Sequence, residues 1–365
     1  MMFWLIACGG PGPVAERPAP EPISQAADPA ENSAPVGVRT VDAGGQTAEV
    51  WYPAPEASRS DATELANYQQ FLPTAVTDLV GEIVFPDVEE GAIRDAPVRV
   101  PDGEWPTVIF SHGFGGMRLQ SLDYAVHLAS RGYVVFAVDH VGRRFEDLLP
   151  CIFKPPLEGC DLSGMSGQDG AVEDITALID WIEGGGGEFY NSPTVIGMSG
   201  HSAGGGSTVT LTDLDDRVDA ALIMAAPGVP SRDVPTLLLG GTCDSFANAS
   251  EMADVAPVGG LVEIAAAGHL AFSDLCELHL LELSNATLVD RDDVNSAYLT
   301  GLVSLASDGC AEAVPDVETC ADASYLPIAT SDPIVRHYST VFFDDALLGE
   351  GAGVTDAVYP DATLR

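Results

Sequence analysis

The stretch "GMSGHSAGGGS", residues 197–207, decides how the whole chain is interpreted. It places Ser202 in the spacing Gly-x-Ser-x-Gly, which a plain glycine-rich turn can also show by chance. A continuous apolar run, typical of a buried strand, precedes this spacing, and a segment that can form a helix follows it. Such flanks are typical of a sharp strand-to-helix turn that exposes a serine hydroxyl at the end of a strand. We therefore interpret Ser202 as a candidate nucleophile.

The rest of the chain alternates between apolar runs without polar alternation and segments with helical spacing. After two strands expected near residues 37–54, such runs occupy residues 107–114 and 133–140, and four more follow from the Ser202 region onward. Helical spacing marks residues 119–132, 171–187 and 334–351. This alternation predicts an α/β fold, with a mostly parallel, doubly wound sheet covered by helices on both faces.

The predicted fold occupies residues 36–352 as a single domain. Residues 141–170 and 277–330 interrupt its alternation as insertions, and residues 353–365 form a tail. Ligands of such sheets bind outside the carboxyl ends of the strands. The first insertion follows a strand end, so it is either a lid or rim of the site or an outlying decoration.

The first residues resemble a bacterial lipoprotein signal. Residues 1–8, "MMFWLIAC", end in a lipobox-like Cys8, although a basic region is absent and the apolar stretch is short. Residues 9–35 are rich in Pro, Ala and Glu, a composition that forms an extended tether and no core. We expect a protein outside the cytoplasm, either secreted or anchored to the cell envelope by lipid at Cys8.

The composition excludes several partners. The chain of 365 residues carries 55 Asp and Glu against 15 Lys and Arg, a net charge of −40, and Lys154 is its only lysine. So acidic a surface repels nucleic acids and anionic membranes. A salty habitat and a biased genomic base composition explain it equally well. Because 46% of residues are hydrophobic, a sizeable core is expected.

Cysteine usage favours an oxidising compartment. Six cysteines remain besides Cys8, which is compatible with three disulfides in any of about 15 pairings. Short separations suggest Cys151–Cys160 and Cys310–Cys320, which leaves Cys243–Cys276 by elimination. That last bridge would join the two loops discussed below. No close CxxC or HxxxH spacing points to a metal site, so we expect neither metal nor cofactor.

A serine nucleophile requires a base and an acid, which in this type of fold follow it in the order acid, then histidine. His269 directly follows a buried run, whereas His279 and His337 lie in predicted helical surroundings. Asp244 ends the apolar run "PTLLLGGTCD", where a solvated helix cap is the alternative role. We therefore expect a triad of Ser202, Asp244 and His269.

The developing negative charge on a substrate oxygen requires two backbone amides. Ala203 follows the nucleophile, and Phe114 lies in the glycine-rich loop "SHGFGG" after a strand. We expect these amides to form the oxyanion hole. His112 and His201 neighbour them and are more consistent with orienting the loops than with reacting.

Taken in order, "SHGFGG", "GHSAGG", "LLLGGTCD" and "AAGHLAFSD" resemble the α/β-hydrolases related to platelet-activating-factor acetylhydrolase, dienelactone hydrolase and cutinase-type polyester hydrolases. The resemblance implies a metal-free serine hydrolase of the α/β-hydrolase fold, with the same three residues as triad. Dienelactone hydrolases use a cysteine nucleophile, which is absent here. The strand before the acid ends in "IMAAPGVP", without the Trp of the polyester hydrolases.

The sequence thus predicts a monomeric carboxylic-ester hydrolase. Its expected substrates are short-chain esters, short-acyl phospholipids or polyesters. An acyltransferase or peptidase with the same triad is the first alternative, because a triad selects neither leaving group nor acceptor. A catalytically silent surface binding protein of the same fold is the second.

Overall fold

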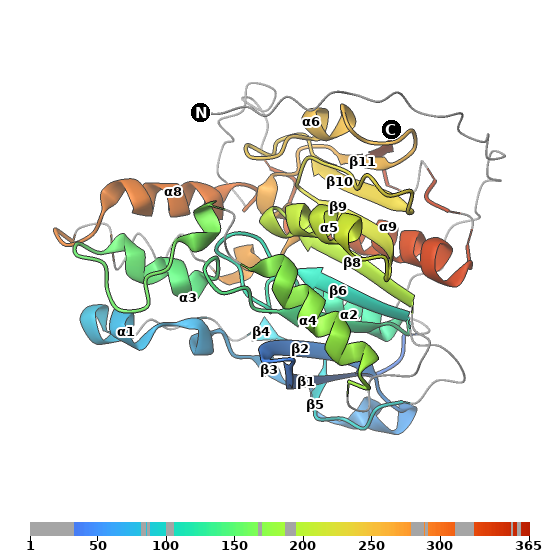
Figure 1. Ribbon diagram of the computed structural model, residues 1–365, viewed down its shortest axis with the longest axis horizontal. Coiled ribbons are helices and arrows are strands. Elements are labelled where there is room, and N and C mark those ends of the chain that lie inside the picture. The colour runs from blue at the N-terminus through green and yellow to red at the C-terminus, as the bar shows by residue number, and fades with distance from the viewer. Residues whose placement is uncertain are drawn as a thin grey trace.

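The computed structural model describes residues 33–365, except 82–84, 86–87, 100–105, 167–169, 187–194, 279–287, 289–290, 311–324, 352 and 356–358. Within these residues, ten strands form one mixed, mostly parallel sheet in the order β12-β11-β10-β9-β8-β6-β7-β2-β1-β5 (Figure 1). The strands are β1 (Val36–Ala43), β2 (Gln46–Pro53), β5 (Ile93–Arg94), β6 (Pro106–Ser111), β7 (Val134–Val138), β8 (Val195–His201), β9 (Val218–Met224), β10 (Thr236–Gly241), β11 (Leu261–Ile264) and β12 (Ala362–Leu364).

The centre of the sheet has the parallel order that the apolar runs predict. Strands β7, β6, β8, β9, β10 and β11 pair in parallel, each with the next. Strands β6 and β7 are buried at every position, which explains why their sequences show no polar alternation. The hairpin of β1 and β2 adds antiparallel strands beside β7. It turns at Gly44 and Gly45, whose φ angles of 69° and 92° suit glycine in a tight hairpin.

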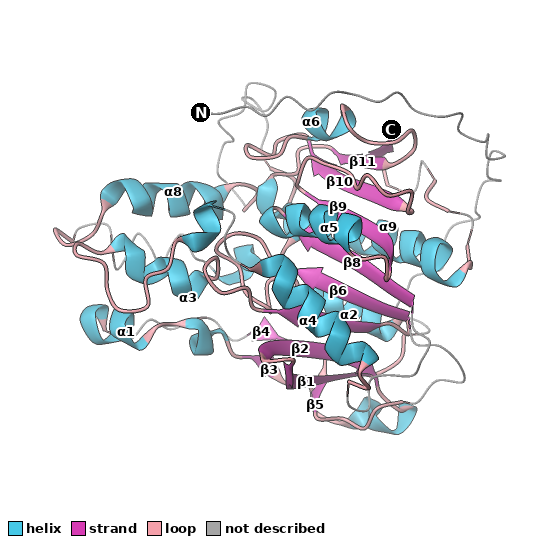
Figure 2. Ribbon diagram, viewed as in Figure 1, coloured by secondary structure: helices cyan, strands magenta, loops and turns pink. Residues whose placement is uncertain are grey.

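Helices cover both faces of this sheet (Figure 2). Helices α4 (Ala171–Glu183) and α5 (Ala203–Leu214) pack on one face, while α2 (Leu122–Ser130) and α9 (Ile328–Leu348) pack together on the other. The short α6 (Ala249–Ala253) contacts β10 and β11. The predicted α/β fold is therefore confirmed. Helix α9 begins six residues before the predicted start at residue 334, and Pro333 lies inside its first turns.

A lobe beside the carboxyl ends of the central strands holds α1 (Thr74–Val80), α3 (Phe145–Leu148) and α8 (Ser296–Ser307) (Figure 1). One apolar cluster joins its parts, with Val76 from α1, Ile152 and Phe153 from the first insertion, and Leu299 from α8. Three segments far apart in sequence thus bury one another and form a small cap. Residues 74–80, which precede both insertions, were not predicted to belong to it. Strands β3 (Leu65–Ala66) and β4 (Val88–Glu89), which lie before and after α1 in the sequence, pair in a separate two-stranded sheet.

Two further features of the described chain differ from prediction. The expected tail includes β12, which pairs antiparallel with β11 at the edge of the sheet. The bridge Cys151–Cys160 forms as predicted, but Cys276 pairs with Cys310, which excludes both Cys243–Cys276 and Cys310–Cys320. The error has a physical cause: proximity along the chain was used as a guide, whereas the second insertion folds back and brings Cys310 beside Cys276. Cys243 is also disulfide-bonded.

Several predictions fall on residues that the structure does not describe. The signal-like residues with Cys8, nearly all of the tether, and Cys320 lie outside the described ranges. None of the described helices combines the length and apolarity that a membrane-spanning segment requires.

Candidate active site

Ser202 occupies the turn between β8 and α5. Its φ and ψ of 55° and −120° are unusual for a residue with a side chain, and they make it the residue that precedes the first turn of α5. The flanking glycines are required by contact. A Cβ on Gly200 would lie 2.2 Å from the carbonyl oxygen of Gly204, and a Cβ on Gly204 would lie 1.9 Å from that of Ser111. The turn therefore has the geometry of a nucleophile elbow.

Three side chains predicted from the sequence meet at this turn. The Nε2 atom of His269 lies 2.9 Å from the Oγ atom of Ser202, and its Nδ1 atom lies 2.9 Å from Oδ2 of Asp244. His269 begins the 3-10 turn His269–Phe272 after β11, and Asp244 follows β10. The carboxyl ends of the parallel strands β8, β10 and β11 thus bring His269 together with residues that are 25 and 67 positions away in the sequence. This geometry is suited to proton transfer from Ser202 to His269.

Asp244 is placed to remain a carboxylate. Burial tends to raise its pKa, but the hydrogen bond and charge of His269, with two backbone amides, hold the pKa below its ordinary value. Those amides belong to Phe246 and Ala247, and each donates to Oδ1 over 2.7 Å. An ionised Asp244 fixes the orientation of the imidazole and stabilises its cation. The ring of Phe246 is half exposed and lies 5.0 Å from that of His269.

Buried side chains hold the loop with the expected oxyanion amide. The side-chain oxygen of Gln120 accepts from the backbone N–H of Gly113 over 2.9 Å, and its amide nitrogen lies 2.9 Å from Nδ1 of His201. Nε2 of His201 lies 2.8 Å from the carbonyl oxygen of His269. Because a carbonyl only accepts, Nε2 donates, and Nδ1 accepts from Gln120. Burial lowers the pKa of His201 to about 3, so this chain of contacts stays neutral.

His112 constrains the same loop from its other side. Its Nε2 atom accepts from the backbone N–H of His140, so its Nδ1 atom donates to the carbonyl oxygen of Gly113. In a trans peptide this carbonyl points opposite to the N–H of Phe114. Fixing the carbonyl therefore fixes the direction of the amide that we expect to bind the oxyanion. Burial, the largest influence, and nearby Arg143 lower the pKa of His112 well below its ordinary value.

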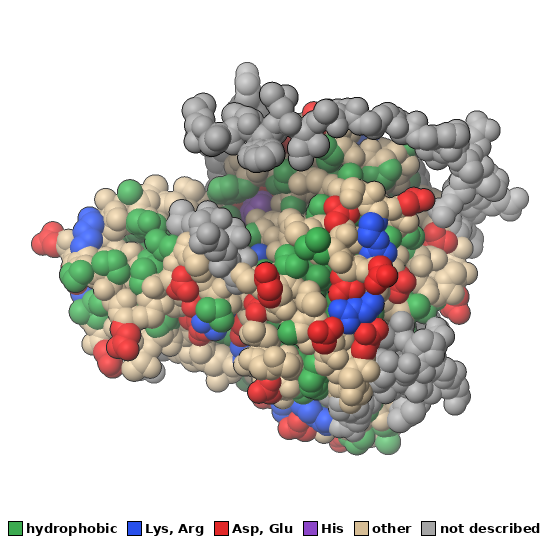
Figure 3. Space-filling view, in the orientation of Figure 1, with side chains coloured by type: hydrophobic (Ala, Val, Ile, Leu, Met, Phe, Trp, Pro, Cys, Tyr) green, Lys and Arg blue, Asp and Glu red, His purple; other side chains and the backbone are tan. Residues whose placement is uncertain are grey.

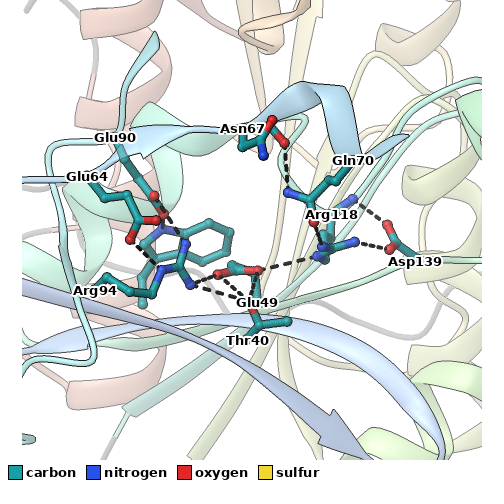
Figure 4. Close-up of polar contacts among 10 residues, drawn as sticks. Thr40, Glu49, Glu64, Asn67, Gln70, Glu90, Arg94, Arg118 and Asp139 are labelled. Atoms are coloured by element: carbon teal, nitrogen blue, oxygen red, sulfur yellow. Dashed lines mark hydrogen bonds and ion pairs between the residues drawn. The ribbon is translucent and has the colours of Figure 1, made fainter. Parts of the chain in front are cut away.

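An ion network anchors the segment that follows this loop (Figure 4). Arg118 donates to Asp139 and to Glu49, and Glu49 also pairs with Arg94. Arg94 reaches Glu90, which is 1% exposed and accepts from the indole of Trp51. These pairs link strand β2, strand β5 and the end of β7 to Arg118 in the segment after β6.

An apolar pocket opens at Ser202. The cap contributes leucine, isoleucine and phenylalanine side chains. The sheet side contributes Phe114, Gln120, Ser202 and His269. The cap residues of the lining are Phe145, Leu149, Ile152, Leu288, Leu299, Leu302 and Leu305. The first insertion was expected to be either a lid or rim of the site or an outlying decoration. Its side chains in the pocket lining support the first alternative. Figure 3 shows a histidine side chain at the surface between the cap and the sheet, and acidic side chains spread over α4 and α5.

The structure brings together the five residues predicted for the triad and the oxyanion hole. Ser202, His269 and Phe114 line the pocket, Asp244 lies behind His269, and Ala203 is the first residue of α5. Gln120 was not predicted from the sequence, nor was Asp308, whose carboxylate accepts from the backbone N–H of His269. Neither residue stands in a motif, so only the tertiary contacts identify them. No described group of His, Cys, Asp and Glu side chains is arranged to hold a metal ion.

Sheet order, nucleophile elbow and triad geometry together define an α/β-hydrolase fold, and comparison of whole structures agrees. A ferulic acid esterase from Streptomyces cinnamoneus superposes with a TM-score of 0.60 over 93% of this chain and 98% of that one, at 22% identity. At this identity the match shows the fold alone.

Sequence comparison confirms the narrower resemblance over part of the chain. Residues 39–144 match the family of platelet-activating factor acetylhydrolase, isoform II. The platelet-activating factor acetylhydrolases of Canis lupus familiaris and Bos taurus are 29% and 31% identical over 103 residues, or 26% of this chain. The match spans 23% of the length of each relative. The family match contains the loop around Phe114 and ends before Ser202.

Proposed function

We propose that the protein is a serine hydrolase of carboxylic esters. The observation that carries the proposal is the continuous contact from Ser202 through His269 to Asp244 at the floor of an apolar pocket. The hydroxyl already lies within hydrogen-bond reach of its base, and the base is oriented by a carboxylate. A binding protein without activity has no need for this alignment.

The reaction follows from the geometry. Ser202 attacks the ester carbonyl while His269 removes its proton, and Asp244 stabilises the resulting imidazolium. The amides of Phe114 and Ala203 receive the oxyanion. His269 then protonates the leaving alcohol. In the second half of the reaction His269 removes a proton from a water molecule, the water attacks the acyl-enzyme, and His269 returns the proton to Ser202 as the acid product leaves.

The pocket favours neutral esters with an apolar acyl group. The described residues of its lining include no Asp, Glu, Lys or Arg, so none of them offers a cation to an anionic acyl chain. Leucine and isoleucine side chains from the cap enclose the space beyond Ser202. Burying each methylene of an acyl chain there gains about 0.8 kcal/mol. Short-chain esters, short-acyl phospholipids and polyester ends remain the proposed candidates.

The bridges Cys151–Cys160 and Cys276–Cys310 fit an oxidising compartment, which supports a site of action outside the cytoplasm. We propose that the protein acts there as a monomer, either secreted or held by lipid at Cys8. Mass spectrometry of the N-terminus of the protein, isolated from a bacterial expression host, tests the anchor.

Hydrolysis of p-nitrophenyl esters with acyl chains from C2 to C16 tests the activity. Wild type should show an optimum chain length, and Ser202→Ala should lose about 10⁶-fold in kcat. Ser250→Ala, an exposed serine of α6, is the matched control and should behave as wild type. Equal rates for wild type and Ser202→Ala would refute the proposal. Product analysis with added alcohols separates hydrolysis from acyl transfer.

A further inference from the structure

The second insertion reaches the catalytic residues through one buried carboxylate. Asp308 is 3% exposed and directly follows helix α8. Its Oδ1 atom accepts from the backbone N–H of His269 over 2.7 Å, and its Oδ2 atom accepts from that of Ser245 over 3.0 Å. Ser245 is the residue after Asp244, so one side chain binds both the loop of the acid and the loop of the base.

Several further contacts fix Asp308 in this position. Its carbonyl oxygen accepts from the N–H of Leu270 over 2.7 Å. A Cβ on Gly268 would lie 2.6 Å from Oδ1, so this close approach requires glycine. The disulfide Cys276–Cys310 closes the chain two residues further on. This is the linking role that the sequence analysis assigned to a bridge between Cys243 and Cys276.

The surroundings of the carboxylate are those of a buried anion bound by polar hydrogens. Tyr325 lies next to it, and burial together with the negative charge of Asp308 raises the pKa of this tyrosine to about 12. Tyr325 is therefore a neutral neighbour that can donate a hydrogen bond. Hydrogen bonds from amides to a carboxylate are shorter and stronger than those to neutral acceptors.

The same residue connects the cap to the triad. Helix α8 places Leu299, Leu302 and Leu305 along the pocket and ends at Asp308. Any displacement of the last turn of α8 therefore moves an acceptor on which the backbone of His269 depends. Binding of a substrate against α8 and alignment of the base are thereby linked through one side chain.

We propose that Asp308 is a positioning residue that holds His269 and Asp244 in register with helix α8. The inference rests on the proposed ester hydrolysis for its kinetic readout, but its structural readout does not. Loss of the carboxylate leaves the pocket lining in place, but the backbone N–H of His269 loses its acceptor. A misplacement of about 1 Å in a catalytic group can cost about 100-fold in rate.

Two variants test the proposal. Asp308→Ala removes both acceptors and should lower kcat for p-nitrophenyl butyrate by about 100-fold, with KM changed less than threefold. Asp308→Asn keeps one acceptor oxygen but turns an NH₂ group toward the other amide, so it should retain more of the activity. Leu302→Ala changes the lining instead, and it should shift the preferred acyl chain length and KM. If Asp308→Ala does not fold, Asp308→Asn decides the outcome.

Asp213→Asn is the matched control, because the carboxylate of Asp213 also accepts from two backbone amides, those of Ser231 and Arg232, away from Ser202. It should keep the wild-type kcat. Folded Asp308 variants with wild-type kcat, or with a lower melting temperature alone, would overturn the inference.

A proton NMR spectrum gives a readout that needs no substrate. The low-field signal of the Nδ1–H of His269 bound to Asp244 should shift or broaden in Asp308→Asn and stay unchanged in Asp213→Asn. An unchanged signal in Asp308→Asn would overturn the inference. If wild type hydrolyses no ester and does not react with a fluorophosphonate, the proposed function fails, and the NMR comparison alone decides the role of Asp308.

Discussion

The contacts of Gln120 with Gly113 and His201, in the two loops beside Ser202, lead to a quantitative prediction. Gln120 is 1% exposed, and its side chain supplies one acceptor to Gly113 and one donor to His201. Gln120→Leu has a similar volume but neither polar group. It should therefore leave the backbone N–H of Gly113 and the Nδ1 atom of His201 buried and without partners.

The size of the effect follows from these two groups. Leaving a buried donor or acceptor unsatisfied costs about 1–3 kcal/mol, so two of them lower the free energy of unfolding by about 2–6 kcal/mol. If the loop moves to reach water instead, the amide of Phe114 leaves the oxyanion site. Loss of one oxyanion donor lowers kcat by about 10²–10³. Stability, activity or both must therefore fall.

Urea unfolding and the kinetics of p-nitrophenyl butyrate hydrolysis measure the two effects on the same preparation. Gln120→Glu keeps the acceptor for Gly113 and removes the donor to His201, so it separates the two contacts. Gln46→Leu, at the start of β2 and remote from Ser202, serves as control. A Gln120→Leu protein with wild-type kcat, and with unfolding free energy within about 0.5 kcal/mol of wild type, would refute the reasoning.

Three further predictions concern the elbow, a buried carboxyl and a disulfide. Gly204→Ala should abolish activity and lower the melting temperature, because its Cβ would lie 1.9 Å from a backbone oxygen of β6; circular dichroism and ester kinetics check this. Burial, the main cause, raises the pKa of Glu90 from 4.5 to about 7 in the folded protein. The folded state therefore binds the proton more tightly, so stability should fall by up to about 3 kcal/mol as pH rises from about 4.5 to 7, and then level off. Glu90→Gln should flatten this dependence in urea titrations at pH 5 and pH 8, and an unchanged slope would contradict it. Replacing Cys276 and Cys310 by serine should lower the unfolding free energy by about 3–4 kcal/mol, since the bridge closes a separation of 34 residues. The replacement should also lower kcat. Wild-type values of both quantities would count against the link between this bridge and Asp308.

Much of the site could be predicted because its residues lie in a local pattern. Ser202 directly follows β8, Asp244 and His269 lie in the loops after β10 and β11, and the carboxyl ends of parallel strands meet at one edge. Gly200 and Gly204 could be identified from the Gly-x-Ser-x-Gly spacing, since the turn is too tight for a Cβ at either position.

Other parts carry no local signal. The pairing Cys276–Cys310 depends on how a long insertion returns to the sheet, and spacing along the chain suggested different partners. Gln120 and Asp308 act on backbone groups of distant residues, and a backbone amide has no sequence identity that could mark its partner. The contribution of residues 74–80 to the cap arises only when α1 packs against the first insertion and α8.

The sequence by itself therefore determined the order of buried strands, the strained turn at Ser202 and the identity of its two partners. These features arise from periodicity and steric limits that act over a few residues. Only the tertiary structure decided which groups hold Ser202, His269 and Asp244 in register, how the cap encloses the pocket and which cysteine pairs with Cys276. Those features depend on contacts between segments far apart along the chain, and their free energy exists only after the chain has folded.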